Sequence, residues 1–70
     1  MTAHVFIFDA LDDDELGELK IHAADWMVES AHGYETTGSA ASWRLSQEFH
    51  DLLGELRREL QTRRARRAAA

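Results

Sequence analysis

The chain contains neither cysteine nor proline. Without cysteine it can form no disulfide bond and no thiolate metal site, which are two common supports of a small fold. Without proline, no residue removes a backbone N–H group from the interior of a helix. Glycine is also sparse, and its four residues form no phosphate-binding loop. The sequence is therefore free to form long helices, and its stability must come from packing, a metal or association.

Long apolar runs are absent as well. The run near the N-terminus, from Val5 to Phe8, has only four residues and no basic segment before it. This is too short for the apolar part of a signal peptide or for a membrane span. We therefore expect a cytoplasmic protein with no membrane partner.

With 70 residues, the chain is long enough for one domain, covering residues 1–70. A single core of this size rarely contributes more than about 3–5 kcal/mol, so small folds usually add a disulfide, a metal or a partner subunit. Because cysteine is absent, we expect association into a homodimer or a higher oligomer.

The N-terminal residues 1–9 are predicted to form a β-strand or an extended arm. Residues 4–8 are rich in β-branched and aromatic side chains, which favour extended structure. A lone strand leaves a row of backbone donors and acceptors unpaired, so it favours pairing with another chain. The alternative is an extended arm that packs its aromatic side chains onto the helices.

Two helices are predicted to follow this segment. Asp9 and Asp12 can cap a first helix over residues 11–32, which would end at Gly33. Residues 33–39 are expected to form a linker, and either Ser39 or Ser42 would cap a second helix over residues 40–62, followed by a basic tail over residues 63–70. The predicted fold is mainly α: an antiparallel two-helix hairpin preceded by a short N-terminal β-strand or extended arm and completed by oligomerisation.

The two predicted helices differ in how much apolar surface they carry. The second helix has one stripe, formed by Leu45, Phe49, Leu52, Leu53, Leu56 and Leu60. The first helix has a much broader apolar face, and one neighbouring helix covers only part of such a face. We expect the remainder to bind another protein or another copy. The predicted interface residues are Phe6, Phe8, Leu19, Trp26, Val28 and Trp43.

The polar face of the first helix offers the strongest candidate metal ligands. His22, Asp25, Glu29 and His32 follow one another along one side of that helix, and Glu29 and His32 have the Glu-x-x-His spacing of di-iron bundles. Such sites, however, place their ligands on inward faces of several helices, whereas these four residues lie opposite the apolar face. We interpret them as a solvated face and expect no cofactor.

Residues for nucleophilic catalysis are not arranged in a recognisable pattern. There is no cysteine and no serine in a Gly-x-Ser-x-Gly turn, and the four histidines fall on predicted surfaces. A chain of this length also struggles to enclose a substrate pocket. We therefore expect that the protein is not an enzyme.

Charge is distributed unevenly along the chain. Residues 1–51 contain eleven acidic residues and two basic ones, whereas residues 52–70 contain two glutamates and six arginines. These arginines are candidates for binding nucleic-acid phosphates: Arg57, Arg58, Arg63, Arg64, Arg66 and Arg67. The alternative is a solvated helix end, in which Glu59 and Arg63 form an (i, i+4) pair.

The predicted order of elements, a strand followed by two helices over residues 4–60, resembles the dimeric ribbon–helix–helix repressors. The resemblance implies a dimer whose paired strands enter the DNA major groove. Neither face of the predicted strand carries Arg, Lys, Asn or Gln, which are the side chains that contact base edges.

Taken together, these patterns predict a small regulator, inhibitor or assembly factor that binds proteins through an acidic, amphipathic helical hairpin. Its partners would be further copies of itself and another protein. The alternative is a DNA-binding regulator of the ribbon–helix–helix kind or a nucleic-acid binder that acts through its basic tail.

Overall fold

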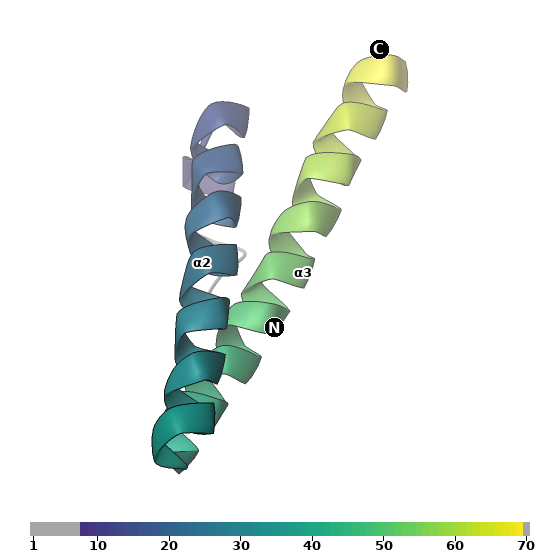
Figure 1. Cartoon of the computed structure of the whole chain (residues 1–70). Coiled ribbons are helices and arrows are strands. Elements are labelled where there is room, and N and C mark those ends of the chain that lie inside the picture. The colour runs from purple at the N-terminus through teal and green to yellow at the C-terminus, as the bar shows by residue number, and fades with distance from the viewer. Residues whose placement is uncertain (1–7, 70) are drawn as a thin grey trace.

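Two long helices dominate the computed structural model, which describes residues 8–69. Helix α2 spans Asp13–Thr37 and helix α3 spans Ala40–Ala69, and they pack side by side in opposite directions. The helices lie close together at the turn and diverge toward the C-terminal end of α3 (Figure 1). The molecule measures 50 × 22 × 16 Å. The predicted two-helix hairpin and the mainly α fold class are confirmed.

The start of α2 is fixed by the acidic residues that precede it. The backbone N–H of Glu15 donates to the Asp12 carboxylate at 2.8 Å, and the N–H of Asp12 donates to the Glu15 carboxylate at 3.0 Å. This reciprocal capping box satisfies two backbone donors that a helix start would otherwise leave free. Asp13 and Asp14 add negative charge at the positive end of the helix dipole.

The end of α2 lies at Gly38, so the prediction that the helix ends at Gly33 is wrong. Gly38 has a φ of 70°, and its N–H donates to the Tyr34 carbonyl at 2.7 Å. This left-handed conformation is the one in which glycine carries no steric cost. Gly33 lies inside the helix at a close approach to α3, where an added Cβ would come within 3.2 Å of the Ser42 hydroxyl oxygen.

The connection between the helices is accordingly short. It consists of Gly38 and Ser39 in place of the predicted linker over residues 33–39. The Ser39 hydroxyl oxygen accepts a hydrogen bond from the backbone N–H of Ser42 at 3.3 Å, so Ser39 caps α3. Helix α3 then continues through the residues predicted as a basic tail and ends at Ala69.

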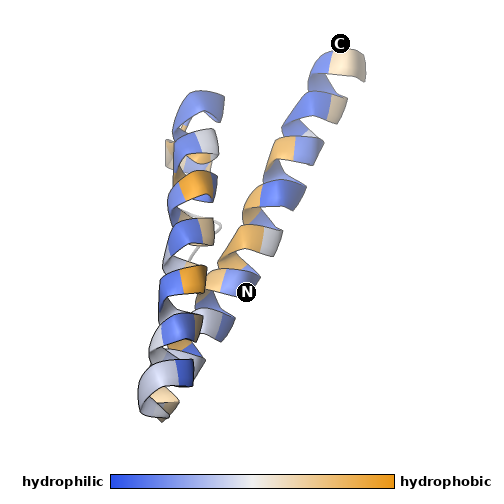
Figure 2. Ribbon diagram, viewed as in Figure 1, coloured by the Kyte–Doolittle hydropathy of each residue, from blue (hydrophilic) through white to orange (hydrophobic). Residues whose placement is uncertain are grey.

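The core lies between the helices, toward the open end of the hairpin. Its buried apolar residues are Phe8, Leu16, Ala23, Leu53 and Leu56, with Leu11, Leu19, Leu52 and Leu60 packed around them. Apolar bands alternate with polar ones along both helices (Figure 2). The predicted leucine stripe of the second helix is thus largely in the core.

The stripe departs from prediction near the turn. Leu45 is 46% exposed, whereas Ser46 is buried. The Ser46 hydroxyl donates to the Trp43 carbonyl at 2.7 Å, which satisfies its polar group inside the interface. Together with Gly33 and Ser42, this small side chain allows the helices to approach closely at the turn.

The N-terminal segment is helical where the structure describes it. Phe8 and Asp9 belong to a short helical turn over residues 8–10, so the predicted strand is wrong for these two residues. Residues 1–7, including Phe6, lie outside the described range. The Phe8 side chain is 5% exposed and belongs to the intramolecular core, so burial within the protomer takes the place of its predicted role at an interface between proteins.

Arg63 joins this helical turn to both long helices. Its guanidinium donates to the carbonyls of Phe8 at 2.6 Å and Leu11 at 2.7 Å, and to the carboxylates of Asp13 at 3.2 Å and Glu59 at 3.4 Å. The side chain is 18% exposed. Partial desolvation lowers the pKa of Arg63, but the hydrogen bonds and charges of Asp13 and Glu59 outweigh it and raise the pKa above its usual value.

We expect Gly38→Ala to destabilise the hairpin by about 1 kcal/mol, because a Cβ opposes the left-handed conformation. Gly38→Asn is the matched control, since asparagine adopts this conformation more readily than alanine does. Thermal unfolding followed by circular dichroism measures both. Equal melting temperatures for the two variants would contradict the role assigned to Gly38.

We expect Arg63→Lys to lower the melting temperature clearly more than Arg67→Lys does. Lysine keeps the positive charge but lacks the planar fork that reaches two carbonyls at once. Arg67 is the control because it contacts Asp13 at 2.6 Å from a side chain that is 67% exposed, and exposed ion pairs contribute little. Similar losses in the two variants would show that charge alone, without the fork, holds the N-terminal turn.

Candidate interaction surface

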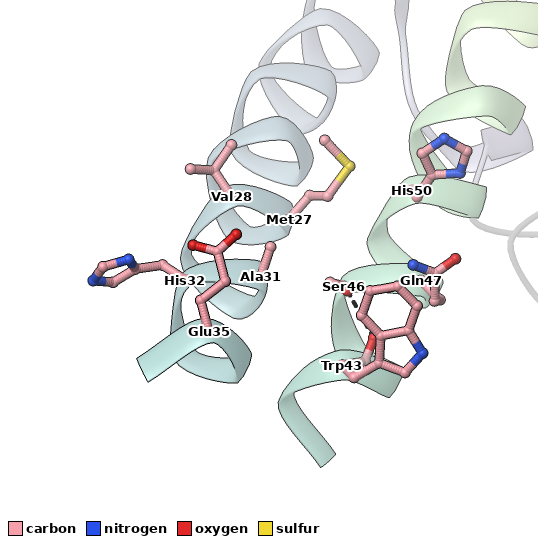
Figure 3. Close-up of a pocket in the computed structure, with 9 residues that line it drawn as sticks. All are labelled: Met27, Val28, Ala31, His32, Glu35, Trp43, Ser46, Gln47 and His50. Carbon is pink, nitrogen blue, oxygen red and sulfur yellow. Dashed lines mark hydrogen bonds between the residues drawn. The ribbon is translucent and has the colours of Figure 1, made fainter. Parts of the chain in front are cut away.

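An open groove lies between the helices near the turn. Its volume is about 400 Å³, and its lining residues are Met27, Val28, Ala31, His32, Glu35, Trp43, Ser46, Gln47 and His50. Met27 and Ala31 point from α2 toward α3, whereas His32 points away from α3 (Figure 3). The floor of the groove is therefore apolar and its rim is polar, as is common for sites that bind protein side chains.

Trp43 forms one edge of this groove and is supported by a second aromatic side chain. The rings of Tyr34 and Trp43 pack in a tilted arrangement with centroids 5.3 Å apart. The Trp43 side chain is nevertheless half exposed. Tryptophan and tyrosine are enriched among residues that anchor protein interfaces, because they combine large apolar area with a polar group.

A second, smaller cavity of about 200 Å³ lies closer to the open end of the hairpin. Its lining residues are Lys20, Arg57, Leu60, Gln61 and Arg64. Within the described residues, these three cations form no ion pair with a carboxylate. On a helix of 3.6 residues per turn, Trp43, His50, Arg57 and Arg64 succeed one another along one flank of α3. The apolar groove and the basic cavity therefore share one open flank of the hairpin.

The predicted interface residues do not gather on this flank. Val28 and Trp43 line the groove, but Trp26 lies on the other flank, where its ring packs on His22 and Phe49 at centroid distances of 5.6 Å. Leu19 is partly buried against the core. The structure thus brings together two of the six predicted residues.

The six candidate arginines also divide into groups. Arg63 and Arg67 contact Asp13, and Arg63 is additionally occupied by backbone carbonyls. Arg57 and Arg64 belong to the basic cavity described above. Arg58 and Arg66 line a third cavity of about 350 Å³ together with Phe8, Asp9, Glu55, Glu59 and Thr62. The arginines therefore do not form one continuous basic surface.

The predicted metal ligands do not form a site. Across residues 8–69, no group of three or more His, Asp or Glu side chains could hold a metal ion. His22 stacks on Trp26, and His32 lines the rim of the groove. A single straight helix cannot converge four ligands on one point, and α3 contributes none to this face.

Sequence reasoning missed two features of the open flank. Lys20 joins Arg57 and Arg64 only when the register of α2 against α3 is known, so no sequence signal identified this cluster. The exposed residues Ile21 and Val28 lie seven apart on α2 and are 64% and 63% exposed. Sequence reasoning included both residues in the broad apolar face of this helix and predicted Val28 as an interface residue, but it did not recognise their spacing as a separate apolar stripe.

Comparison with known proteins adds no relative: no protein-family model matches the chain, and neither a curated protein nor a solved structure is significantly similar to it. In the described part of the chain, neither long helix has the length and apolar character needed to cross a membrane.

We expect that zinc, iron or manganese leaves the melting temperature of the protein unchanged. A ligand that binds the folded state raises its apparent stability, and His22, Asp25, Glu29 and His32 are not arranged to bind one. Thermal unfolding with and without a tenfold excess of each metal measures this. A rise that His32→Ala abolishes would show that these residues do bind the ion.

Proposed function

We propose that the protein is a non-enzymatic interaction module that binds a helical segment of a protein along the open flank of α2 and α3. The proposal is carried by the apolar groove, which Met27, Val28 and Ala31 of α2 line together with Trp43 of α3. A helix that lays its apolar side into such a groove is a common mode of protein recognition. A small regulator, inhibitor or assembly factor would act in this way.

Exposed apolar area supports this function. Ile21, Val28, Tyr34 and Trp43 are large apolar or aromatic residues that the hairpin leaves substantially exposed. Large apolar side chains that remain in water within one surface region favour association. The neighbouring cations Lys20 and Arg57 would attract an acidic partner and raise its rate of encounter.

The shape of the groove favours binding over catalysis. Its two histidines, His32 and His50, lie on the rim, and His32 points away from the other helix (Figure 3). A general base must lie within hydrogen-bond reach of a substrate and in an environment that excludes water. An open groove with an apolar floor meets neither condition.

Nucleic-acid binding has less support from the arrangement of the arginines. Arg63 is held by the core of the hairpin, and Arg67 is paired with Asp13. The acidic start of α2 lies beside them, and its charge opposes the approach of a phosphate backbone. Phe8 and Asp9 are helical, which removes two residues of the strand that a ribbon–helix–helix dimer would require.

Site-specific photocrosslinking in the cells that express the protein tests the proposed function. A benzophenone side chain at position 43, on the rim of the groove, is expected to give a covalent adduct with a protein. The same group at position 51 is the control, because the Asp51 side chain is 78% exposed and does not line the groove. Met27→Glu should suppress the adduct at position 43, since it introduces a charge into the apolar floor.

The identity of the adduct is then determined by mass spectrometry, which separates a second copy of the chain from another protein. Either result supports an interaction module. Absence of any protein adduct at position 43, or an equal yield at position 51, would overturn the proposed function.

A further inference from the structure

A second seven-residue repeat runs along α2, on the side away from the buried residues Leu16 and Ala23. Its members are spaced alternately three and four residues apart. They are Asp14, Gly17, Ile21, Ala24, Val28, Ala31 and Glu35. Ile21 and Val28 are the most exposed large apolar residues of the described chain. A stripe with this spacing is the pattern of a coiled-coil seam, and α3 leaves its two large apolar residues, Ile21 and Val28, exposed.

We infer that a second copy of the chain occupies this seam, so that the two α2 helices pack in parallel across a two-fold axis. The inference rests on the proposed function and names the partner of its open flank. The four helices of the dimer would then form a bundle with the two α2 helices at its centre.

The residue types along the seam favour two parallel strands. In the heptad notation, Ile21 and Val28 take the a positions, where β-branched residues favour parallel dimers. Gly17, Ala24 and Ala31 take the d positions, and their small side chains allow the two helices to approach closely. The acidic Asp14 and Glu35 mark the ends of the seam, so the contact between them, from Gly17 to Ala31, is limited to about four turns of helix.

In the parallel orientation one pair of charges beside the seam, Lys20 and Asp25, is complementary, whereas Asp13 and Glu18, which have the same spacing, are both acidic. Lys20 occupies a g position and Asp25 an e position, and in a parallel pair the g residue of one helix lies beside the e residue five positions further along the other. Within one protomer these two side chains are about 140° apart around the helix, so they do not pair. The two-fold axis would form this Lys20–Asp25 contact twice.

The position of Lys20 extends this complementarity to α3. Lys20 shares its cavity with Arg57 and Arg64, and no carboxylate lines it. Asp25 of the second copy would bring a negative charge to this cavity. In an antiparallel pair, the g positions of one α2 helix, which include Lys20 and Met27, would instead lie beside the g positions of the other α2 helix. Asp25 of the second copy would then lie away from the cavity that contains Lys20.

Sedimentation equilibrium of the purified full-length protein tests the dimer. We expect twice the protomer mass at concentrations of tens of micromolar. Val28→Glu should weaken association at least tenfold while circular dichroism shows that the helices persist. Leu45→Glu is the matched control, because Leu45 is a similarly exposed apolar residue that lies outside the seam. This variant should remain dimeric.

Orientation is tested by a disulfide, since the chain contains no cysteine of its own. Ala31→Cys should oxidise to a covalent dimer, because the two copies of residue 31 face each other only in the parallel register. Ala41→Cys, at an exposed position outside the seam, should not. Lys20→Glu and Asp25→Lys should each weaken the dimer, and the double variant should restore it.

A monomeric wild-type protein at high micromolar concentration would overturn the inference, and so would a dimer that Val28→Glu does not weaken. A dimer in which Ala31→Cys fails to crosslink would overturn the parallel orientation. Each of these results concerns the dimer, whereas the proposed function is tested separately by the crosslink at position 43. If position 43 still forms an adduct with another protein, the open flank binds a different helix, whereas loss of both signals would overturn both proposals.

Discussion

The contact of Arg63 with two backbone carbonyls is the interaction on which the arrangement of the chain depends. The Phe8 carbonyl accepts the backbone N–H of Leu11 at 3.1 Å, and the Arg63 guanidinium donates both to this carbonyl and to that of Leu11. Phe8 is thereby held in the space where α2 and α3 diverge, and it completes the core there. Without this contact, a two-helix hairpin would have to leave one flank of its leucines in water.

Covering one flank in this way determines which surface is left for a partner. The N-terminal turn lies against Leu11 and the leucines of α3, so the uncovered surface is the flank that contains Trp43, Met27 and Lys20. Helix α2 consequently has two apolar surfaces with different roles. Leu16 and Ala23 form the internal core, whereas Ile21 and Val28 remain outside it. The apolar face of α2 is broad because it includes both of these surfaces, and one neighbouring helix covers only the first.

The sequence predicted the elements whose signals are local. The capping acids before α2, the serine at the start of α3 and the leucine periodicity identified two helices and the hairpin between them. Gly33 was misread because a glycine inside a helix and a glycine at its end look alike in sequence. Its role is set by a close approach to Ser42, which only packing reveals. Phe8 was misread because β-propensity in a short apolar segment is weak compared with burial against a core. The candidate site was the part of the structure that the sequence predicted least well. The cluster of Lys20 with Arg57 and Arg64 depends on the register of α2 against α3, which no local sequence signal encodes.

The distribution of charge shows that part of the basic end of the chain serves the protein itself. Of the six arginines, Arg63 and Arg67 neutralise Asp13, and so the acidic start of α2 and the basic end of α3 form one electrostatic unit within the protomer. A polyanion would have to compete with these internal carboxylates. Among the cations outside this unit, Lys20, Arg57 and Arg64 line one cavity, which shares its flank with an apolar groove. Positive charge beside exposed apolar side chains favours an acidic, amphipathic helix over a nucleic acid. Such a helix offers both negative charge and apolar contact on one ligand. The outer face of α2 carries both properties, and this is the physical reason for proposing a second copy as the partner.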